Sequence, residues 1–282
     1  MKSTLVLLLC LSFVGLNAAD LAEARRLMES RKVPEARPLI EAYLKEKPED
    51  AEALILLGQC QLQMMQSEPA LATLEKAVEL APKNVEAHAA LGMALLGEAG
   101  RKSSISYARK GKKELEKALE IDPKHVASLE NLVGFYDNAP WIVGGDKDKA
   151  KDLVKRLKEI APTRGFLVDV GMQAKAKEFD QAFRQCDERL AATPNDYPAL
   201  YELGRIAGMA SKRQQDGVKA LQACLTLPVP AGSPGHAGVN FRLGVLHKQL
   251  GNKDQAEACF NEALRLGADD KNLVARVAKA RQ

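Results

Sequence analysis

Apolar and small residues recur along most of the chain at the spacing of amphipathic helices that pair as hairpins. In residues 51–82, the leucines that fall at helical spacing are Leu54, Leu57, Leu71 and Leu74. Gly58, Ala70 and Ala77 stand where two antiparallel helices come closest, and Pro82 cannot continue a helix. The pattern therefore predicts a helical hairpin, which must stack on others because it cannot bury its apolar face alone.

The hairpin recurs with a period close to 34 residues. Pro48 and Pro82 are 34 residues apart, and Leu57-Gly58 reappears 34 residues later as Leu91-Gly92. The next two intervals between such prolines are 41 and 39 residues, so the third and fourth hairpins carry insertions. We predict about seven hairpins and a C-terminal capping helix, at residues 20–50, 51–84, 85–125, 126–162, 163–195, 196–231, 236–269 and 270–282. In the capping helix, Leu273, Val274 and Val277 are expected to face inward.

The joint spacing of Leu-Gly, Ala, Leu, Ala and Pro in residues 51–82 resembles the tetratricopeptide repeat family, against the alternative of an irregular helical bundle. The resemblance covers nearly all of the chain after its N-terminal segment. It implies an all-α fold, a right-handed α-solenoid. A loop at residues 139–145 is similar to one in a group of uncharacterised exported bacterial members of this family, and that similarity implies no activity.

The N-terminus has the form of a secretory signal. Lys2 precedes an apolar run from Leu5 to Leu16, and the small residues Ala18 and Ala19 follow. We predict a signal peptide at residues 1–19 and an exported protein, periplasmic or secreted; the alternative is an uncleaved membrane anchor. No second long apolar run follows, so no transmembrane segment is expected after signal removal.

The insertion in the third hairpin is basic. Six lysines and arginines lie between Arg101 and Lys113 with no acid among them. We favour a solvated helix face over a site for an anionic ligand or glycan, because no glycine-rich phosphate loop accompanies the cluster. The net charge of +4 is small, and no nucleic acid is expected as a partner.

The insertion in the fourth hairpin, residues 137–146, holds the only tryptophan. We favour a structural plug, in which Trp141 and Ile142 pack over the end of a neighbouring helix. The alternative is a recognition loop, since Trp is enriched in interface hot spots. Gly144 and Gly145 allow unusual backbone angles, and Asp146 is placed to cap the following helix. The candidate residues of a recognition loop are Pro140, Trp141, Gly144 and Gly145.

The sequence indicates no catalytic, metal or cofactor site. The cysteines after the N-terminal segment form no C-x-x-C pair, and the four histidines are scattered. No nucleophile or phosphate-loop motif is present. We therefore predict no enzymatic activity and no cofactor. Cys224 and Cys259 are the best candidates for a disulfide, on second helices of adjacent repeats.

The family resemblance implies a partner-binding groove along the first helices of the repeats. In this sequence its residues include Ile55, Gln59, Gln63, Met93, Glu130, Asp137, Tyr201, Arg205, Phe241 and Lys248. The Lys and Asn of the family's carboxylate clamp are absent. We predict a scaffold or assembly factor that binds a partner protein or peptide in this groove. The alternatives are a carrier of an anionic ligand or glycan on the basic third repeat, and a structural spacer.

Overall fold

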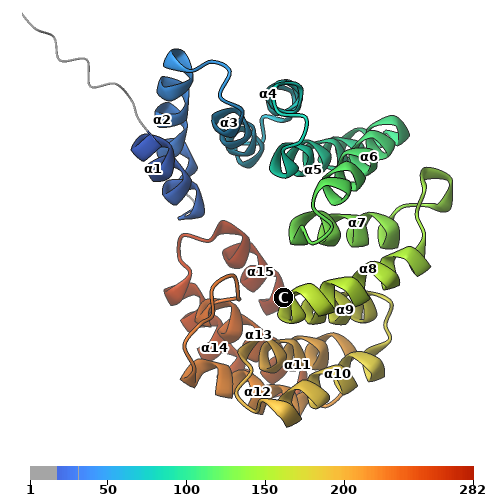
Figure 1. Cartoon of the computed structure of the whole chain (residues 1–282). Coiled ribbons are helices and arrows are strands. Elements are labelled where there is room, and N and C mark those ends of the chain that lie inside the picture. The colour runs from blue at the N-terminus through green and yellow to red at the C-terminus, as the bar shows by residue number, and fades with distance from the viewer. Residues whose placement is uncertain (1–17, 31) are drawn as a thin grey trace, which may run out of the picture. The chain divides into compact units, whose positions relative to one another are not determined.

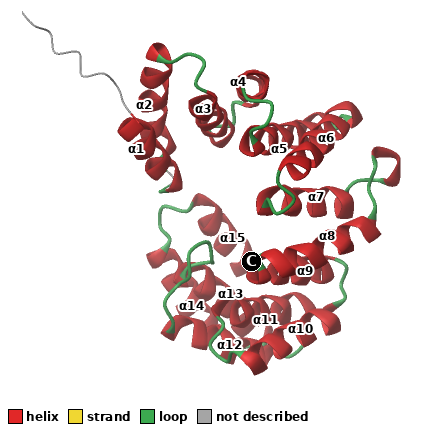
Figure 2. Ribbon diagram, in the orientation of Figure 1, coloured by secondary structure: helices red, strands yellow, loops and turns green. Residues whose placement is uncertain are grey.

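The computed structural model describes residues 18–30 and 32–282, and within them the protein is entirely helical (Figures 1 and 2). These residues form fifteen α-helices and one short 3-10 helix, without a β-strand. The all-α fold of stacked helical hairpins is therefore confirmed. No helix in this part of the chain is both long and apolar enough to cross a bilayer. The predicted signal peptide lies almost wholly outside the described residues.

The chain divides into two compact units, residues 1–151 and 152–282, and the boundary falls inside helix α8 (Lys147–Ile160). We call them the N-terminal and the C-terminal unit. The repeat spacing did not indicate this division. The N-terminal unit contains α1 (Ala18–Glu29), α2 (Val33–Glu46), α3 (Ala51–Gln63), α4 (Ser67–Leu80), α5 (Val85–Lys102), α6 (Ile105–Ile121) and α7 (Val126–Asn138). Successive helices pack on one another, as expected of stacked hairpins.

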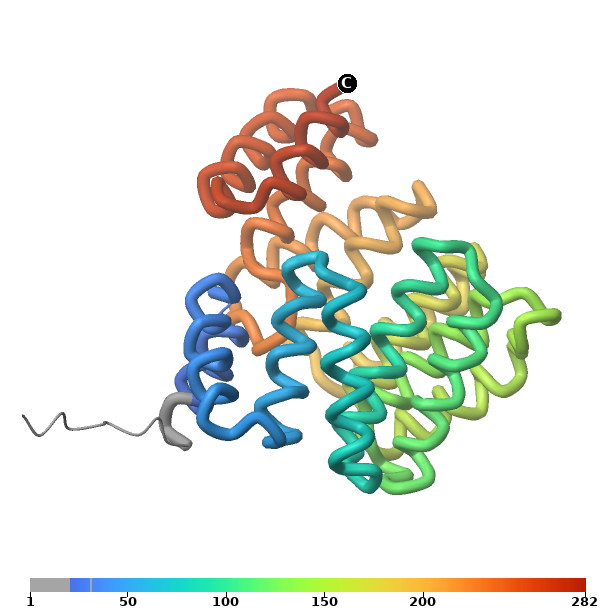
Figure 3. Tube along the Cα trace, turned by 90° about the horizontal axis from the view of Figure 1, so that it is seen from above, coloured from blue at the N-terminus to red at the C-terminus, as the bar shows by residue number. Residues whose placement is uncertain are grey.

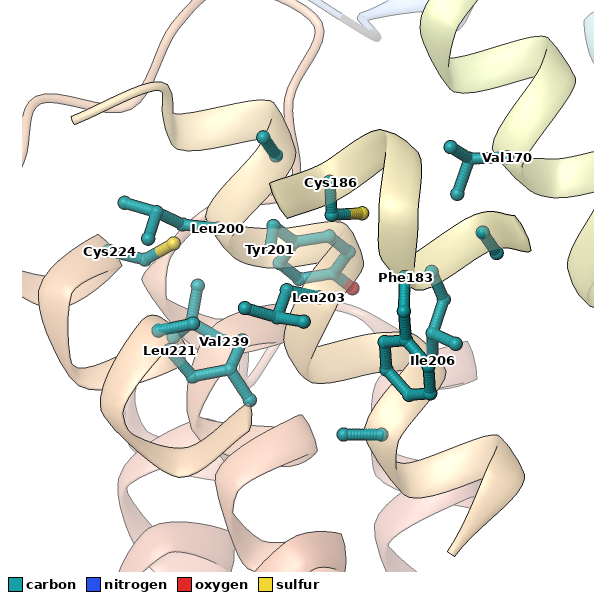
Figure 4. Packing of buried hydrophobic residues seen from close by; sticks show 14 of the residues in the cluster. Val170, Phe183, Cys186, Leu200, Tyr201, Leu203, Ile206, Leu221, Cys224 and Val239 are labelled. Carbon is teal, nitrogen blue, oxygen red and sulfur yellow. The ribbon is translucent and has the colours of Figure 1, made fainter. Parts of the chain in front are cut away.

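The C-terminal unit is built in the same way. Its helices are α9 (Pro162–Lys175), α10 (Phe179–Ala192), α11 (Tyr197–Ala210), α12 (Gln214–Thr226), α13 (His236–Gln249), α14 (Lys253–Leu266) and α15 (Lys271–Arg281). Figure 4 shows part of its core, in which Phe183, Leu203, Ile206 and Leu221 meet from α10, α11 and α12. This burial of apolar surface, shared between consecutive hairpins, stabilises the stack.

Glycines let the two helices of a hairpin approach closely. A Cβ added at any of four glycines would come within 2.7 Å of a side chain on the paired helix. The pairs are Gly58 with Leu74, Gly92 with Leu115, Gly204 with Leu221, and Gly244 with Phe260. The Leu-Gly positions of the repeat are therefore required by helix packing.

Several helices begin at a side-chain cap. The capping oxygens accept from backbone N–H groups of the first turn and belong to Asp50, Asn84, Ser104, Asp196 and Asp270. Each cap follows a short turn, so it marks where the chain re-enters a helix. Local sequence thus sets the start of these elements.

Helix α15 closes the C-terminal unit. Leu273 and Val277 are buried and pack with Phe241 and Phe260 of the preceding hairpin. Val274 is 41% exposed, so the prediction that it faces inward is wrong. A helix turns by roughly 100° per residue, so a neighbour of the buried Leu273 points away from the same surface.

Candidate functional site

The two insertions meet in the N-terminal unit. Helices α5 and α6 have 18 and 17 residues, whereas the helices of the second hairpin have 13 and 14. The first insertion therefore lengthens both helices of the third hairpin. The second insertion forms the loop that follows α7, residues 139–146, and projects from the helices (Figure 3). The turn of the long hairpin and this loop both line one hollow.

This hollow, which we call the α5–α7 hollow, has a volume of about 750 Å³. Its lining is mostly apolar, with polar groups from serine, asparagine and glutamate side chains. The lining residues are Leu96, Ala99, Gly100, Ser103, Ser104, Ile105, Ala108, Glu130, Asn131, Gly134, Phe135, Asn138, Ala139, Pro140, Ile142 and Val143. An apolar concavity of this size with a few polar groups is typical of a binding site.

The insertion loop is held in one shape by backbone hydrogen bonds. It contains the 3-10 helix η1 (Trp141–Val143), and the Gly145 N–H donates to the Pro140 carbonyl at 3.1 Å. The Asp146 N–H donates to the Tyr136 carbonyl of α7 at 2.9 Å. The Asp146 carboxylate accepts from two N–H groups of α8, which confirms its predicted capping role.

The two glycines of the loop are needed for different reasons. Gly144 has φ +111°, a left-handed conformation that favours glycine. A Cβ at Gly145 would lie 1.8 Å from the Ala139 carbonyl oxygen, so close approach of the backbone excludes a side chain there. Both glycines therefore serve the shape of the loop, and neither lines the hollow.

The structure contradicts the preferred interpretation of Trp141 as a plug. Its side chain is 85% exposed, and it is not among the residues that line the hollow. Ile142 is 55% exposed and lines the hollow together with Val143 and Pro140. The hydrogen bonds of the loop turn Trp141 toward solvent, a result that sequence alone could not give.

The first part of the basic cluster pairs with a buried acid. Arg101 Nη2 lies 2.6 Å from Glu98 Oε2, and Lys102 Nζ lies 3.2 Å from the same oxygen. Lys102 also pairs with Glu68 of α4 at 3.3 Å. Hydrogen bonding from Arg101 lowers the pKa of Glu98 to about 2.

The second part of the cluster supports the insertion loop. Arg109 Nη2 donates to the Ile142 carbonyl at 3.1 Å. Lys112 pairs with Glu116 at 3.4 Å and lies 5.7 Å from the ring centre of Tyr136. These four of the six basic residues therefore do not converge on one anion site.

Seven of the ten predicted groove residues have side chains at least partly exposed. They are Gln59, Gln63, Met93, Glu130, Asp137, Arg205 and Lys248. Met93 is 46% exposed, and Glu130 also lines the α5–α7 hollow. Arg205 pairs with Glu202, and Lys248 Nζ donates to the Ala280 carbonyl at 2.6 Å. Partner contact by these residues stays a prediction.

The other three predicted groove residues are buried. Ile55 packs with Leu71 and Leu74, Tyr201 lies in the core of Figure 4, and Phe241 contacts Phe260. They are 5%, 7% and 6% exposed. Because these apolar side chains turn into the cores, they support the helix faces from beneath, which corrects the prediction that they line an open groove.

Sequence reasoning missed the part of the hollow that α5 and α6 supply. Leu96, Ala99 and Ile105 read as ordinary helix positions. One feature of the sequence could have indicated the hollow: two consecutive repeats both carry insertions. Stacking of the repeats brings these insertions together.

The described cysteines are free thiols: Cys60, Cys186 and Cys224 are buried, and Cys259 is partly exposed. No disulfide joins Cys224 and Cys259 in this structure. Burial raises the pKa of Cys186 and of Cys224 to about 12. Within residues 18–30 and 32–282, no group of three or more His, Cys, Asp or Glu side chains could hold a metal ion.

Comparison with known proteins identifies the repeats. Residues 18–96 and residues 237–270 each match a family model described as a tetratricopeptide repeat. The chain therefore contains tetratricopeptide repeats in these two segments. No curated protein matches the sequence.

Solved structures with the same fold are distant in sequence. A tetratricopeptide repeat protein from Parabacteroides merdae aligns with a TM-score of 0.62 at 14% identity, over 94% of this chain and 98% of that one. A chain of the APC/C hetero-tetramer Cut9–Hcn1 aligns with a TM-score of 0.54 at 16% identity, over 96% of this chain and 50% of that one. At such identities the likeness shows the fold alone.

Proposed function

We propose that the protein is a scaffold or assembly factor that binds a segment of a partner protein along the first helices of its hairpins. The observation that carries this proposal is the α5–α7 hollow, which lies between two such first helices. Glu130 belongs both to the predicted groove face and to the hollow. We propose further that the protein is exported, from the form of its N-terminus, and that it has no catalytic role.

The chemistry of the hollow fits a peptide segment. Its apolar floor, with Leu96, Phe135 and Val143, accepts large apolar side chains. Asn131 and Ser103 bring polar groups that suit a peptide backbone. An apolar anchor in a pocket with polar groups around it is the usual form of a helix or strand bound in a groove.

The alternatives receive less support. An anionic ligand on the third repeat would need basic groups that converge, but Arg101 and Lys102 pair with Glu98, and Arg109 binds the insertion loop. A structural spacer would leave an apolar hollow of about 750 Å³ without a role.

Two glycines allow a matched test of the hollow. Gly134 lines it and Gly97 does not, yet both lie in helices and a Cβ at either meets no atom within 4 Å. A side chain therefore starts in open space at both positions, and leucine is a better helix former than glycine, so Gly134→Leu and Gly97→Leu should fold.

The experiment is crosslinking and pull-down from a native extract, with mass spectrometry to identify the captured protein. We expect wild type and Gly97→Leu to capture the same partner, and Gly134→Leu to lose at least about tenfold in capture because the leucine occupies the hollow. Circular dichroism checks the fold. Equal capture by Gly134→Leu would contradict the proposed site.

A further inference from the structure

At the tip of the insertion loop, Pro140–Ile142, two large apolar side chains are exposed. Trp141 is 85% exposed and Ile142 is 55% exposed. The loop that carries them projects from the helices (Figure 3). Contiguous exposed apolar side chains are a mark of interaction sites. Nothing in the scaffold proposal uses Trp141, because it does not line the α5–α7 hollow.

The loop holds this tip in place. Val143 N–H donates to the Pro140 carbonyl at 2.9 Å, and Gly144 N–H donates to the Trp141 carbonyl at 3.0 Å. From α6, Arg109 donates to the Ile142 carbonyl at 3.1 Å. The exposure of Trp141 therefore belongs to a hydrogen-bonded structure, and ordering of the tip adds little cost to binding.

Cations surround the base of the loop. Nζ of Lys112 and Nζ of Lys149 lie 5.7 and 5.6 Å from the ring centre of Tyr136. Each has an acidic partner, Glu116 at 3.4 Å and Asp146 at 3.7 Å, so these pairs are close to neutral.

Further positive charge remains exposed on the two helices that flank the loop. Lys110 and Lys113 of α6, which follow Arg109 in the chain, and Lys147 at the start of α8 are exposed, and so is the acid Asp148 of α8. Together with Arg109, they give the surroundings of the tip a surplus of positive charge. An anionic partner is complementary to this charge.

We propose that the tip and its flanking lysines dock the protein on an anionic lipid bilayer. Tryptophan favours the boundary between lipid and water, where its ring is apolar and its N–H can bind a polar group. Exposed lysines are attracted to anionic headgroups, and an apolar group plus basic residues provide the two signals that stable attachment requires. A projecting tip enters a soft bilayer without a shaped partner, whereas a protein would need a matching cavity. The proposal does not depend on the scaffold function.

The single tryptophan makes the test direct, since all tryptophan emission comes from Trp141. The probes are vesicles of phosphatidylglycerol with phosphatidylcholine, and vesicles of phosphatidylcholine alone. With the full chain, we expect a blue shift on the anionic vesicles, reduced by added salt, and little shift on the neutral ones. Absence of a shift on anionic vesicles would overturn the proposal, and an equal shift on both would overturn its electrostatic part.

Vesicle flotation with matched variants locates the contact. Trp141→Ala should lower binding at least about tenfold, while Met65→Ala, which removes an 88% exposed side chain from the turn between α3 and α4, should not. Lys110→Glu with Lys113→Glu should lower it by about tenfold or more, and Lys83→Glu with Lys124→Glu, at exposed positions in other turns, should have a smaller effect. Equal effects of test and control variants would refute the assignment.

Another occupant of the tip, or another site for lipid, would be recognised in the same experiments. A blue shift that grows with protein concentration without lipid, together with a dimer that Trp141→Ala abolishes, would assign the tip to a second copy and overturn lipid docking. Loss of lipid binding in Gly134→Leu, with Trp141→Ala unaffected, would move lipid binding to the hollow and would also overturn it.

Discussion

Glu98 shows how one residue can couple two hairpins of the N-terminal unit. The Glu98 side chain has no solvent exposure. Its carboxylate forms ion pairs with Arg101 and Lys102. Ser67 of α4 also contributes a hydrogen bond. A buried carboxylate is stable only when paired, so these donors hold the turn of the long hairpin against its neighbour.

The lowered pKa of Glu98 predicts a specific sensitivity to acid. A carboxylate with a folded pKa of about 2 and a usual value of 4.5 adds stability above pH of about 4.5, and loses it as the pH falls toward 2. Glu98→Gln should lower the midpoint of thermal unfolding at pH 7 and reduce the difference between pH 7 and pH 3. Circular dichroism melts at both values measure this. Glu120→Gln, at an exposed position, is the control; an equal effect of both would contradict the role of burial.

At the scale of elements, α15 ends the stack by covering the last hairpin. Without it, the apolar surface of α13 and α14 around Phe260 would face water. A terminal element with one apolar and one polar face is what a solenoid requires at its end.

Substitutions at two adjacent residues of α15, one buried and one exposed, test how this helix packs. Leu273→Ala removes a side chain that is 4% exposed, and should lower the free energy of unfolding by about 2–5 kcal/mol. Val274→Ala changes a side chain that is 41% exposed, and should cost less than about 0.5 kcal/mol. Urea unfolding followed by circular dichroism compares them. Similar losses for both would mean that α15 does not pack as described.

At the scale of the whole molecule, each of the two units has at least one cysteine buried in its core, so thiol reactivity can measure how well each core excludes solvent. Cys60 lies in the core of the N-terminal unit, and Cys186 and Cys224 lie in the core of the C-terminal unit. Burial raises the pKa of all three, so the reactive thiolate is scarce at neutral pH. Cys259 is partly exposed.

Thiol labelling followed by peptide mass spectrometry tests this burial. In the folded protein at pH 8, we expect Cys186 and Cys224 to react at least about 100-fold more slowly than in denaturant, and Cys259 to react faster than either. In denaturant, all four should react at similar rates. Rapid labelling of Cys186 in the folded protein would show that this core opens readily.

Much of the fold could be predicted from the sequence because its determinants are local. Leu57-Gly58 and Leu91-Gly92 mark hairpins through spacings of a few residues, and Asp50 and Asn84 start helices through their own side chains. The candidate site was less accessible. Ile55 lies at a position assigned to the groove, yet it is 5% exposed, because burial depends on how the next helix packs against it.

By itself, the sequence determined the helices, their pairing and the places where the repeat is interrupted. Only the tertiary structure decided what the interruptions do. Residues 96–108 and 130–143 form one hollow because stacking brings neighbouring hairpins together, and Trp141 faces water because backbone hydrogen bonds turn the loop outward. The physical reason is range: helix formation and capping act within a turn or two of chain, whereas the hollow needs residues of successive hairpins, more than twenty positions apart, to come together.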